Sequence, residues 1–136
     1  MEAIASGPSI VRWVKSQLAD ESLKEHFPEG ELTAKLVSDA AESGNQLALA
    51  AYERAGKYIG LAIADLLHIF NVPRIIIGGG VSRAGDILFD PIRKSVNEFV
   101  ISDVFLQNLE ILPAALGDDS GLMGALVLSR EIFSDN

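Results

Sequence analysis

The sequence contains no cysteine and only two histidines, His26 and His68. Without cysteine, these residues can form neither a disulfide framework nor a cysteine-based zinc site. The histidines lie too far apart in the sequence to indicate a shared metal site, and each is expected on the surface or on a helix face. With 136 residues and 49% hydrophobic content, the chain is long enough for one domain with a hydrophobic core and too short for two.

Basic residues and long apolar runs are also scarce. The chain has 11 Lys and Arg against 19 Asp and Glu, and its net charge of −8 disfavours a nucleic-acid partner through this segment. The N-terminus lacks the basic start and apolar stretch of a signal peptide. The most apolar segment, residues 58–72, is interrupted by Asp65 and is shorter than the ~20 residues of a membrane span. We therefore expect a cytoplasmic protein with no membrane partner.

Hydrophobic periodicity predicts helices throughout the first half of the chain. Apolar residues recur at helical spacing over residues 8–19 and again over residues 32–44, and Gly44 is expected to end the second helix as a C-cap. A longer helix is predicted over residues 46–70, with Asn45 as its N-cap. We expect this long helix to be the central one.

Two glycines, Gly56 and Gly60, lie one turn apart inside the long helix. Each destabilises an isolated helix by ~1 kcal/mol relative to alanine. A neighbour must therefore approach the backbone closely. Tight packing against another helix or strand is the simpler explanation, and room for a ligand is the alternative.

The second half of the chain adds two strands. The runs 74–77 and 109–113 are short and apolar, and we expect them to form parallel strands joined by a helical crossover. Within the crossover, Ser82 is predicted to cap a helix that ends at Phe89. The Asp90-Pro91 pair is then predicted to break that helix and begin another.

A last helix is predicted to run to Phe133, with Asp118 or Asp119 as its N-cap rather than as a catalytic group. The fold class is therefore α/β, rich in helices and with a small parallel β element. An isolated pair of strands is marginal. Either further strands come from outside this chain, or helices form most of the core.

Three consecutive glycines, Gly78, Gly79 and Gly80, follow the first strand. A dinucleotide-binding fingerprint would need a third spaced glycine where Arg83 stands, and a carboxylate after the next strand, so it is excluded. A P-loop is excluded because no Gly-Lys-Ser/Thr follows. A glycine turn at the carboxyl end of a parallel strand still allows close approach to a ligand, and a plain tight connection is the alternative.

A second glycine cluster, "LGDDSGLMGAL" at residues 116–126, also lies between a strand and a helix. Gly121 and Gly124 are one turn apart at the start of that helix. Two such corners at the ends of parallel strands would flank one crevice.

The segments "IGGGVSRAGDILFDPIR" and "ILPAALGDDSGLMGALVL", with the opening "EAIASG", resemble the carboxyl-terminal part of the ROK family. This family comprises sugar kinases and sugar-responsive repressors of the hexokinase and actin-like ATPase superfamily. The resemblance covers essentially all 136 residues. It implies a partial actin-like ATPase, or ribonuclease H-like, lobe and a single carboxyl-terminal lobe fragment over residues 1–136.

The resemblance also implies which parts of a ROK kinase are missing. The amino-terminal lobe, its phosphate loop, the catalytic aspartate, the Glu-x-Gly-His sugar motif and the cysteine-rich zinc motif have no counterpart here. Met1 would then be an experimenter's start, a truncated gene or a split reading frame. We accordingly expect no catalytic and no metal-ligating residue in this chain, and no turnover by the chain alone.

Residue by residue, the resemblance implies a site for ATP, with Mg²⁺, and for a hexose. Glu2 matches the glutamate that hydrogen-bonds sugar hydroxyls. The nucleotide-binding residues would come from the two glycine corners, as follows: Gly78, Gly79, Gly80, Ser82, Gly117 and Gly121.

Three functions stay open. The chain is either the nucleotide-binding part of a hexose kinase, for glucose before N-acetylated hexosamines, or the carboxyl-terminal part of a ROK repressor, or a non-catalytic fragment that self-associates. The intact glycines at positions 78–80 favour the kinase. A homodimer is compatible with each of the three.

Overall fold

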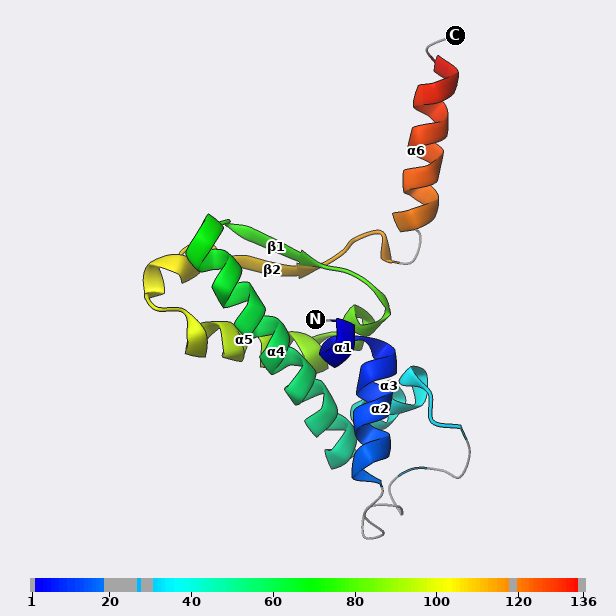
Figure 1. Ribbon diagram of the computed structural model, residues 1–136, viewed down its shortest axis with the longest axis vertical. Coiled ribbons are helices and arrows are strands. Elements are labelled where there is room, and N and C mark those ends of the chain that lie inside the picture. Colours follow the sequence, from blue (N-terminus) through cyan, green and yellow to red (C-terminus); the bar gives the residue numbers. More distant parts are fainter. Residues whose placement is uncertain (1, 19–26, 28–30, 118–119, 135–136) are drawn as a thin grey trace.

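The computed structural model describes residues 2–18, 27, 31–117 and 120–134 (Figure 1). Its elements follow in chain order: α1 (Glu2–Ala5), α2 (Gly7–Gln17), α3 (Ala34–Glu42), α4 (Gln46–Phe70), β1 (Arg74–Ile77), η2 (Gly80–Ala84), α5 (Asp86–Phe99), η3 (Asp103–Leu106), β2 (Glu110–Pro113) and α6 (Ser120–Ser134). Within these described ranges, no helix is long and apolar enough to cross a membrane. His26 lies outside them.

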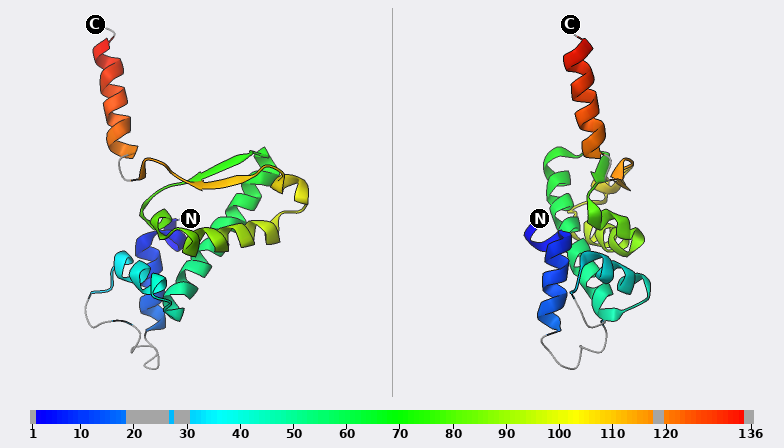
Figure 2. Two further views of the ribbon diagram at one scale, coloured as in Figure 1. Left: turned by 180° about the vertical axis from the view of Figure 1, so that it is seen from behind. Right: turned by 90° about the vertical axis from the view of Figure 1, so that its right-hand side faces the viewer.

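Helix α4 is the central helix, as predicted, and its bounds are those expected from the sequence. Asn45 caps it, since its Oδ1 accepts a hydrogen bond from the Ala48 amide at 3.0 Å. Helices α2 and α3 pack against its amino-terminal half, and α5 crosses it further along (Figures 1 and 2). The core includes Tyr52 and Leu67 of α4 and Phe89 of α5, all buried.

The two glycines of α4 lie where α5 crosses it. A Cβ placed on Gly56 would come within 2.5 Å of the Pro91 Cβ, and one on Gly60 within 2.5 Å of the Ser95 Cβ. Ser95 is buried, and its hydroxyl donates to the Lys57 carbonyl at 2.7 Å. Close helix packing therefore explains both glycines, and a ligand is not needed to account for them.

The crossover between the strands differs from the prediction. Ser82 does not cap a helix; it lies within η2, and its hydroxyl donates to the Gly79 carbonyl at 2.7 Å. Helix α5 begins at Asp86, after Gly85, and continues through Pro91 to Phe99 without a break. The helix survives the loss of one backbone hydrogen bond because residues on both sides of Pro91 are buried in the core.

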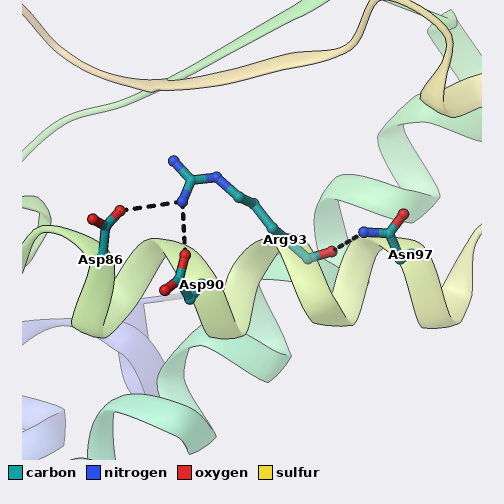
Figure 3. A network of polar contacts seen from close by, with 4 residues as sticks. All are labelled: Asp86, Asp90, Arg93 and Asn97. Carbon is teal, nitrogen blue, oxygen red and sulfur yellow. Dashed lines mark hydrogen bonds and ion pairs between the residues drawn. The ribbon is translucent and has the colours of Figure 1, made fainter.

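A cluster of exposed charges also spans the site of the expected break. The Arg93 guanidinium contacts Asp86 at 3.2 Å and Asp90 at 2.9 Å, and the Asn97 amide donates to the Arg93 carbonyl at 2.8 Å (Figure 3). These contacts join the first turn of α5 to the turns that follow. Because the charged side chains are exposed, their contribution to stability is small.

Strands β1 and β2 form a parallel sheet of two strands. Ile75 and Ile111 are paired in register, and both pack against the core. Ile76 and Leu112 are also paired but lie on the other face, where they are 64% and 41% exposed. The predicted fold class is therefore confirmed: a helix-rich α/β arrangement with a small parallel sheet.

Two remaining predictions concern His68 and the last helix. The His68 Nε2 accepts a hydrogen bond from the Ile101 amide at 3.1 Å, and its ring meets Phe105 edge-on, so this histidine is structural. Helix α6 stands away from the other elements (Figures 1 and 2). Asp118 and Asp119, its expected caps, lie outside the described residues.

Candidate functional site

The two strands end side by side, with the first glycine corner at the carboxyl edge of the sheet. Gly78 directly follows β1, and a Cβ built on it would be 3.4 Å from the Cβ of Ala114, which directly follows β2. The parallel pairing of Ile77 with Pro113 produces this proximity. Ala114 precedes the second corner, so the expectation that both corners flank one crevice stays a prediction.

The turn after β1 has a conformation that requires glycine. Gly79 has a φ of 91° and a ψ of 169°, a region that is essentially restricted to glycine. Its carbonyl accepts hydrogen bonds from the Ser82 amide at 3.1 Å and from the Ser82 hydroxyl at 2.7 Å. No atom lies within 4 Å of a Cβ built on Gly79 or Gly80. Hydrogen bonds from Ser82 thus hold the turn, while no protein atom covers it beside Gly79 and Gly80.

Beside this turn lies a cavity of about 670 Å³. It is open to solvent on one side and is lined by the start of α2, one face of α3, the side of α4 and η2. Its lining residues are Gly7, Pro8, Ile10, Ala34, Lys35, Ser38, Asp39, Glu42, Tyr52, Gly80, Val81 and Arg83. This volume is in the range of pockets that hold small molecules and cofactors.

Charges of both signs line the cavity. Lys35 and Arg83 carry positive charge, and Asp39 and Glu42 carry negative charge. The carboxylates accept hydrogen bonds from hydroxyl or amino groups, and the cations pair with anionic groups such as phosphate. The lining thus offers one set of groups to a polar, neutral ligand moiety and another to an anionic one.

Tyr52 forms the inner wall of the cavity and is only 3% exposed. Burial raises the pKa of its phenol above the ordinary value, and the carboxylates of Glu42 and Asp39 raise it further, whereas a hydrogen bond with Ser38 lowers it. At neutral pH the phenol is therefore uncharged, so it presents an aromatic surface and one hydroxyl to the cavity.

The structure brings some of the predicted site residues together and leaves others apart. Gly80 lines the cavity, Gly78, Gly79 and Ser82 form the adjoining turn, and Gly117 has a φ of 50° just beyond β2. Two others lie elsewhere in the fold: Gly121 is in α6, and Glu2 begins α1, with its side chain outside the described part of the structure.

Sequence reasoning missed the contribution of α3. Four polar residues of α3 follow one another at steps of three, one and three, so they share one face of that helix; they are Lys35, Ser38, Asp39 and Glu42. Only the apolar face of α3, which includes Val37 and Ala41, entered the prediction. The polar face is a signal in the sequence from which this wall of the cavity could have been predicted.

Metal ligands are not grouped in the described part of the chain. Among these residues, no group of three or more His, Cys, Asp or Glu side chains is positioned to hold a metal ion. The candidate site is consequently a cavity with charged walls beside an open backbone turn.

Comparison with known proteins defines the class of fold first. A ROK family glucokinase from Streptomyces griseus, solved in complex with glucose and AMPPNP, superposes with a TM-score of 0.83 and 32% identity, covering 96% of this chain and 44% of that one. The described elements therefore form part of an actin-like ATPase fold.

The sequence comparisons then give the family. Residues 1–132 match the ROK family, and the chain belongs to it. It is 34% identical to the glucokinase of Thermotoga maritima over 96% of this chain and 42% of that protein. It is also 28% identical to the DNA-binding transcriptional dual regulator NagC of Escherichia coli K12, over 96% of this chain and 31% of that protein. The chain thus spans less than half the length of these relatives.

Proposed function

We propose that this cavity binds the adenosine part of ATP and that the chain is the nucleotide-binding part of an ATP-dependent hexose kinase. One observation carries the proposal: Gly80 belongs both to the glycine turn after β1 and to the cavity wall. A nucleotide whose base and ribose fill the cavity would therefore lay its phosphates along the turn. The similarity to a glucokinase solved with AMPPNP, an analogue of ATP, supports this placement.

The walls of the cavity suit the two ends of a nucleotide differently. Asp39 and Glu42 would accept hydrogen bonds from the ribose hydroxyls, because ionised carboxylates are acceptors only. Arg83, next to the turn, would pair with phosphate oxygens. Gly79 and Gly80 have no side chain to obstruct the phosphates, so the backbone would approach them closely.

The reaction itself needs groups that this proposal places elsewhere. In phosphoryl transfer, a sugar hydroxyl oxygen bonds to the γ-phosphorus, the bond to the leaving ADP breaks, and a base takes the hydroxyl proton. Glu2 would orient the hexose by accepting its hydroxyl hydrogens. Mg²⁺ would arrive with the nucleotide, and glucose is the sugar we propose. Without the base and the main phosphate loop, this chain alone would not turn over.

A second candidate function is the sugar-sensing part of a ROK repressor. The similarity to NagC favours it, since 96% of this chain matches that regulator. A sensor without kinase activity has no need of ATP, so nucleotide binding separates the two candidates.

The test is a calorimetric titration of the chain with Mg-ADP, with glucose titrated in parallel. The kinase proposal predicts saturable ADP binding that Gly80→Val weakens at least tenfold, or about 1.4 kcal/mol, because the valine side chain enters the cavity. Gly124→Val is the matched control, because Gly124 lies in α6, where a Cβ meets no atom within 4 Å.

Two results would count against the kinase proposal. One is the absence of ADP binding in a chain that circular dichroism shows to be folded. The other is ADP binding that Gly80→Val and Gly124→Val leave equally unchanged, because the nucleotide would then lie outside the cavity. Glucose binding without ADP binding would favour the repressor.

A further inference from the structure

Gly7 lies where three walls of the cavity meet. It is the first residue of α2, and a Cβ built on it would be 3.2 Å from the Ala34 Cβ and 3.9 Å from the Val81 Cγ2. Ala34 is the first residue of α3, Val81 belongs to η2, and all three residues line the cavity. A side chain at this one position of α2 would therefore touch both α3 and η2.

Space, and not backbone conformation, explains why this residue is glycine. Gly7 does not have a positive φ, whereas Gly79 does. Carbon atoms in ordinary contact are about 3.5–4.0 Å apart, so a methyl group on Gly7 would displace Ala34 by a few tenths of an ångström. The missing side chain thus lets α2 and α3, which pack side by side (Figures 1 and 2), begin closer together than another residue would allow.

Of these two helices, α3 has the start that moves more readily. In α2, Ser9 is buried, and its hydroxyl accepts a hydrogen bond from the Ser6 hydroxyl at 3.0 Å. In α3, residues 34–36 at the start are all exposed. A short helix moves as one rigid element, so a displacement at Ala34 is passed on to Asp39 on the cavity face of α3.

We propose that Gly7 is a positioning residue for the nucleotide. It lets α3 lie close enough for Asp39 and Glu42 to accept hydrogen bonds from the ribose hydroxyls, and so makes the site selective for ribonucleotides over dideoxynucleotides. The inference rests on the proposed function, which brings the ribose to these two carboxylates. Because both carboxylates are exposed and compete for water, the expected preference is modest, about tenfold.

The test compares two affinities of the same folded chain, for Mg-ADP and for Mg-2′,3′-dideoxy-ADP, by calorimetry. Folding is checked by circular dichroism at the same temperature. The unsubstituted chain should prefer ADP about tenfold, Gly7→Ala should lower this preference to about threefold, and Gly7→Val should abolish it, because the larger side chain displaces α3 further. A general loss of stability would not change this ratio of affinities.

A second substitution separates the position of α3 from other effects. Adding Ala34→Gly to Gly7→Ala transfers the methyl group from α3 to α2 across the same contact, so the tenfold preference should return. Ala34→Gly alone and Gly124→Ala in α6 are the matched controls, and both should leave the preference unchanged. Independently, Asp39→Ala combined with Glu42→Ala should abolish the preference without any change at Gly7.

Four results would overturn the proposal. The first is a preference for ADP that Gly7→Ala and Gly7→Val leave at its original value. The second is a loss in Gly7→Ala that Ala34→Gly does not restore, since the new methyl group and not α3 would then be the cause. The third is a full preference in the chain that lacks both carboxylates. The fourth is equal binding of ADP and dideoxy-ADP by the unsubstituted chain.

These results are distinguishable from a failure of the kinase proposal. In each of the four the unsubstituted chain still binds ADP, so the kinase proposal stands. A folded chain that binds no ADP would end both proposals together. If Gly7→Val does not fold, Gly7→Ala and the variant without Asp39 and Glu42 carboxylates decide the question, because they change only a close contact and exposed side chains.

Discussion

The packing of α4 on α5 makes Gly60 the residue least able to accept a side chain. A Cβ at this position would be 2.5 Å from the Ser95 Cβ and 2.7 Å from the Ile92 carbonyl oxygen. The oxygen belongs to the backbone of α5, so it moves only if the helix moves. We therefore predict that Gly60→Ala separates the two helices and destabilises the fold.

The magnitude follows from three contributions. Overpacking of a close contact costs about 1–3 kcal/mol, and the backbone contact places Gly60→Ala at the upper end of that range. Displacing Ser95 also removes its hydrogen bond to the Lys57 carbonyl, which contributes about 1 kcal/mol. Alanine is a better helix former than glycine by about 1 kcal/mol, which offsets part of the loss. The net loss in unfolding free energy is about 2–3 kcal/mol.

The assay is urea denaturation followed by circular dichroism at equal protein concentration. Gly124→Ala in α6 is the matched control, and it should cause no loss, because a Cβ there meets no atom within 4 Å. Adding Ser95→Gly to Gly60→Ala should recover part of the stability by removing two clashing atoms, the Ser95 Cβ at 2.5 Å and its Oγ at 2.7 Å. If Gly60→Ala were as stable as the unsubstituted chain, α4 and α5 would not pack at this distance and the reasoning would be refuted.

Two further predictions concern the cavity and its turn. Burial raises the pKa of Tyr52 in the folded chain, so its contribution to stability is present below the ordinary phenol pKa of about 10 and is lost as the pH rises through the higher folded value. Urea titrations between pH 8 and pH 11 should show this alkaline loss, and an equal loss in Tyr52→Phe would contradict it. Gly79→Ala should destabilise by about 1–3 kcal/mol because of its φ of 91°. Gly80→Ala should change stability little, because a Cβ there meets no atom within 4 Å and Gly80 does not have a positive φ of this kind. Equal thermal midpoints for Gly79→Ala and Gly80→Ala would refute the backbone argument.

The elements that could be predicted from sequence are those whose local signals and tertiary packing agree. Helix α4 has its apolar stripe and a capping residue, Asn45, and its observed bounds match the predicted ones. Strand β1 is a β-branched run between a proline and three glycines, and it too lies where the sequence places it. In both cases the buried side chains are the ones that define the pattern.

The crossover could not be predicted because packing there overrides local preference. Ser82 has the chemistry of an N-cap, yet its hydroxyl bonds to the Gly79 carbonyl within η2. Pro91 has the chemistry of a helix breaker, yet α5 continues through it because Gly56 of α4 leaves room for its ring. That contact joins residues far apart in the chain, and no local pattern contains it.

The candidate site also has one part that could be predicted from the sequence and one part that could not. The glycine turn at positions 78–80 was visible because glycine clusters after a strand are distinctive. The cavity walls were not, because they combine the start of α2, the polar face of α3 and Tyr52 of α4. Only the folding of these elements against one another brings the walls together.

The central claim is that the cavity beside the glycine turn at positions 78–80 holds the nucleotide. The most direct test is an NMR titration with Mg-ADP that follows the amide chemical shifts. The account predicts that the shifts which change with saturation come from the cavity and the turn, namely Ser38, Asp39, Gly79, Gly80 and Val81, whereas those of Gly124 in α6 stay constant. Saturable changes confined to other elements, or a folded chain whose shifts do not respond to Mg-ADP, would contradict it.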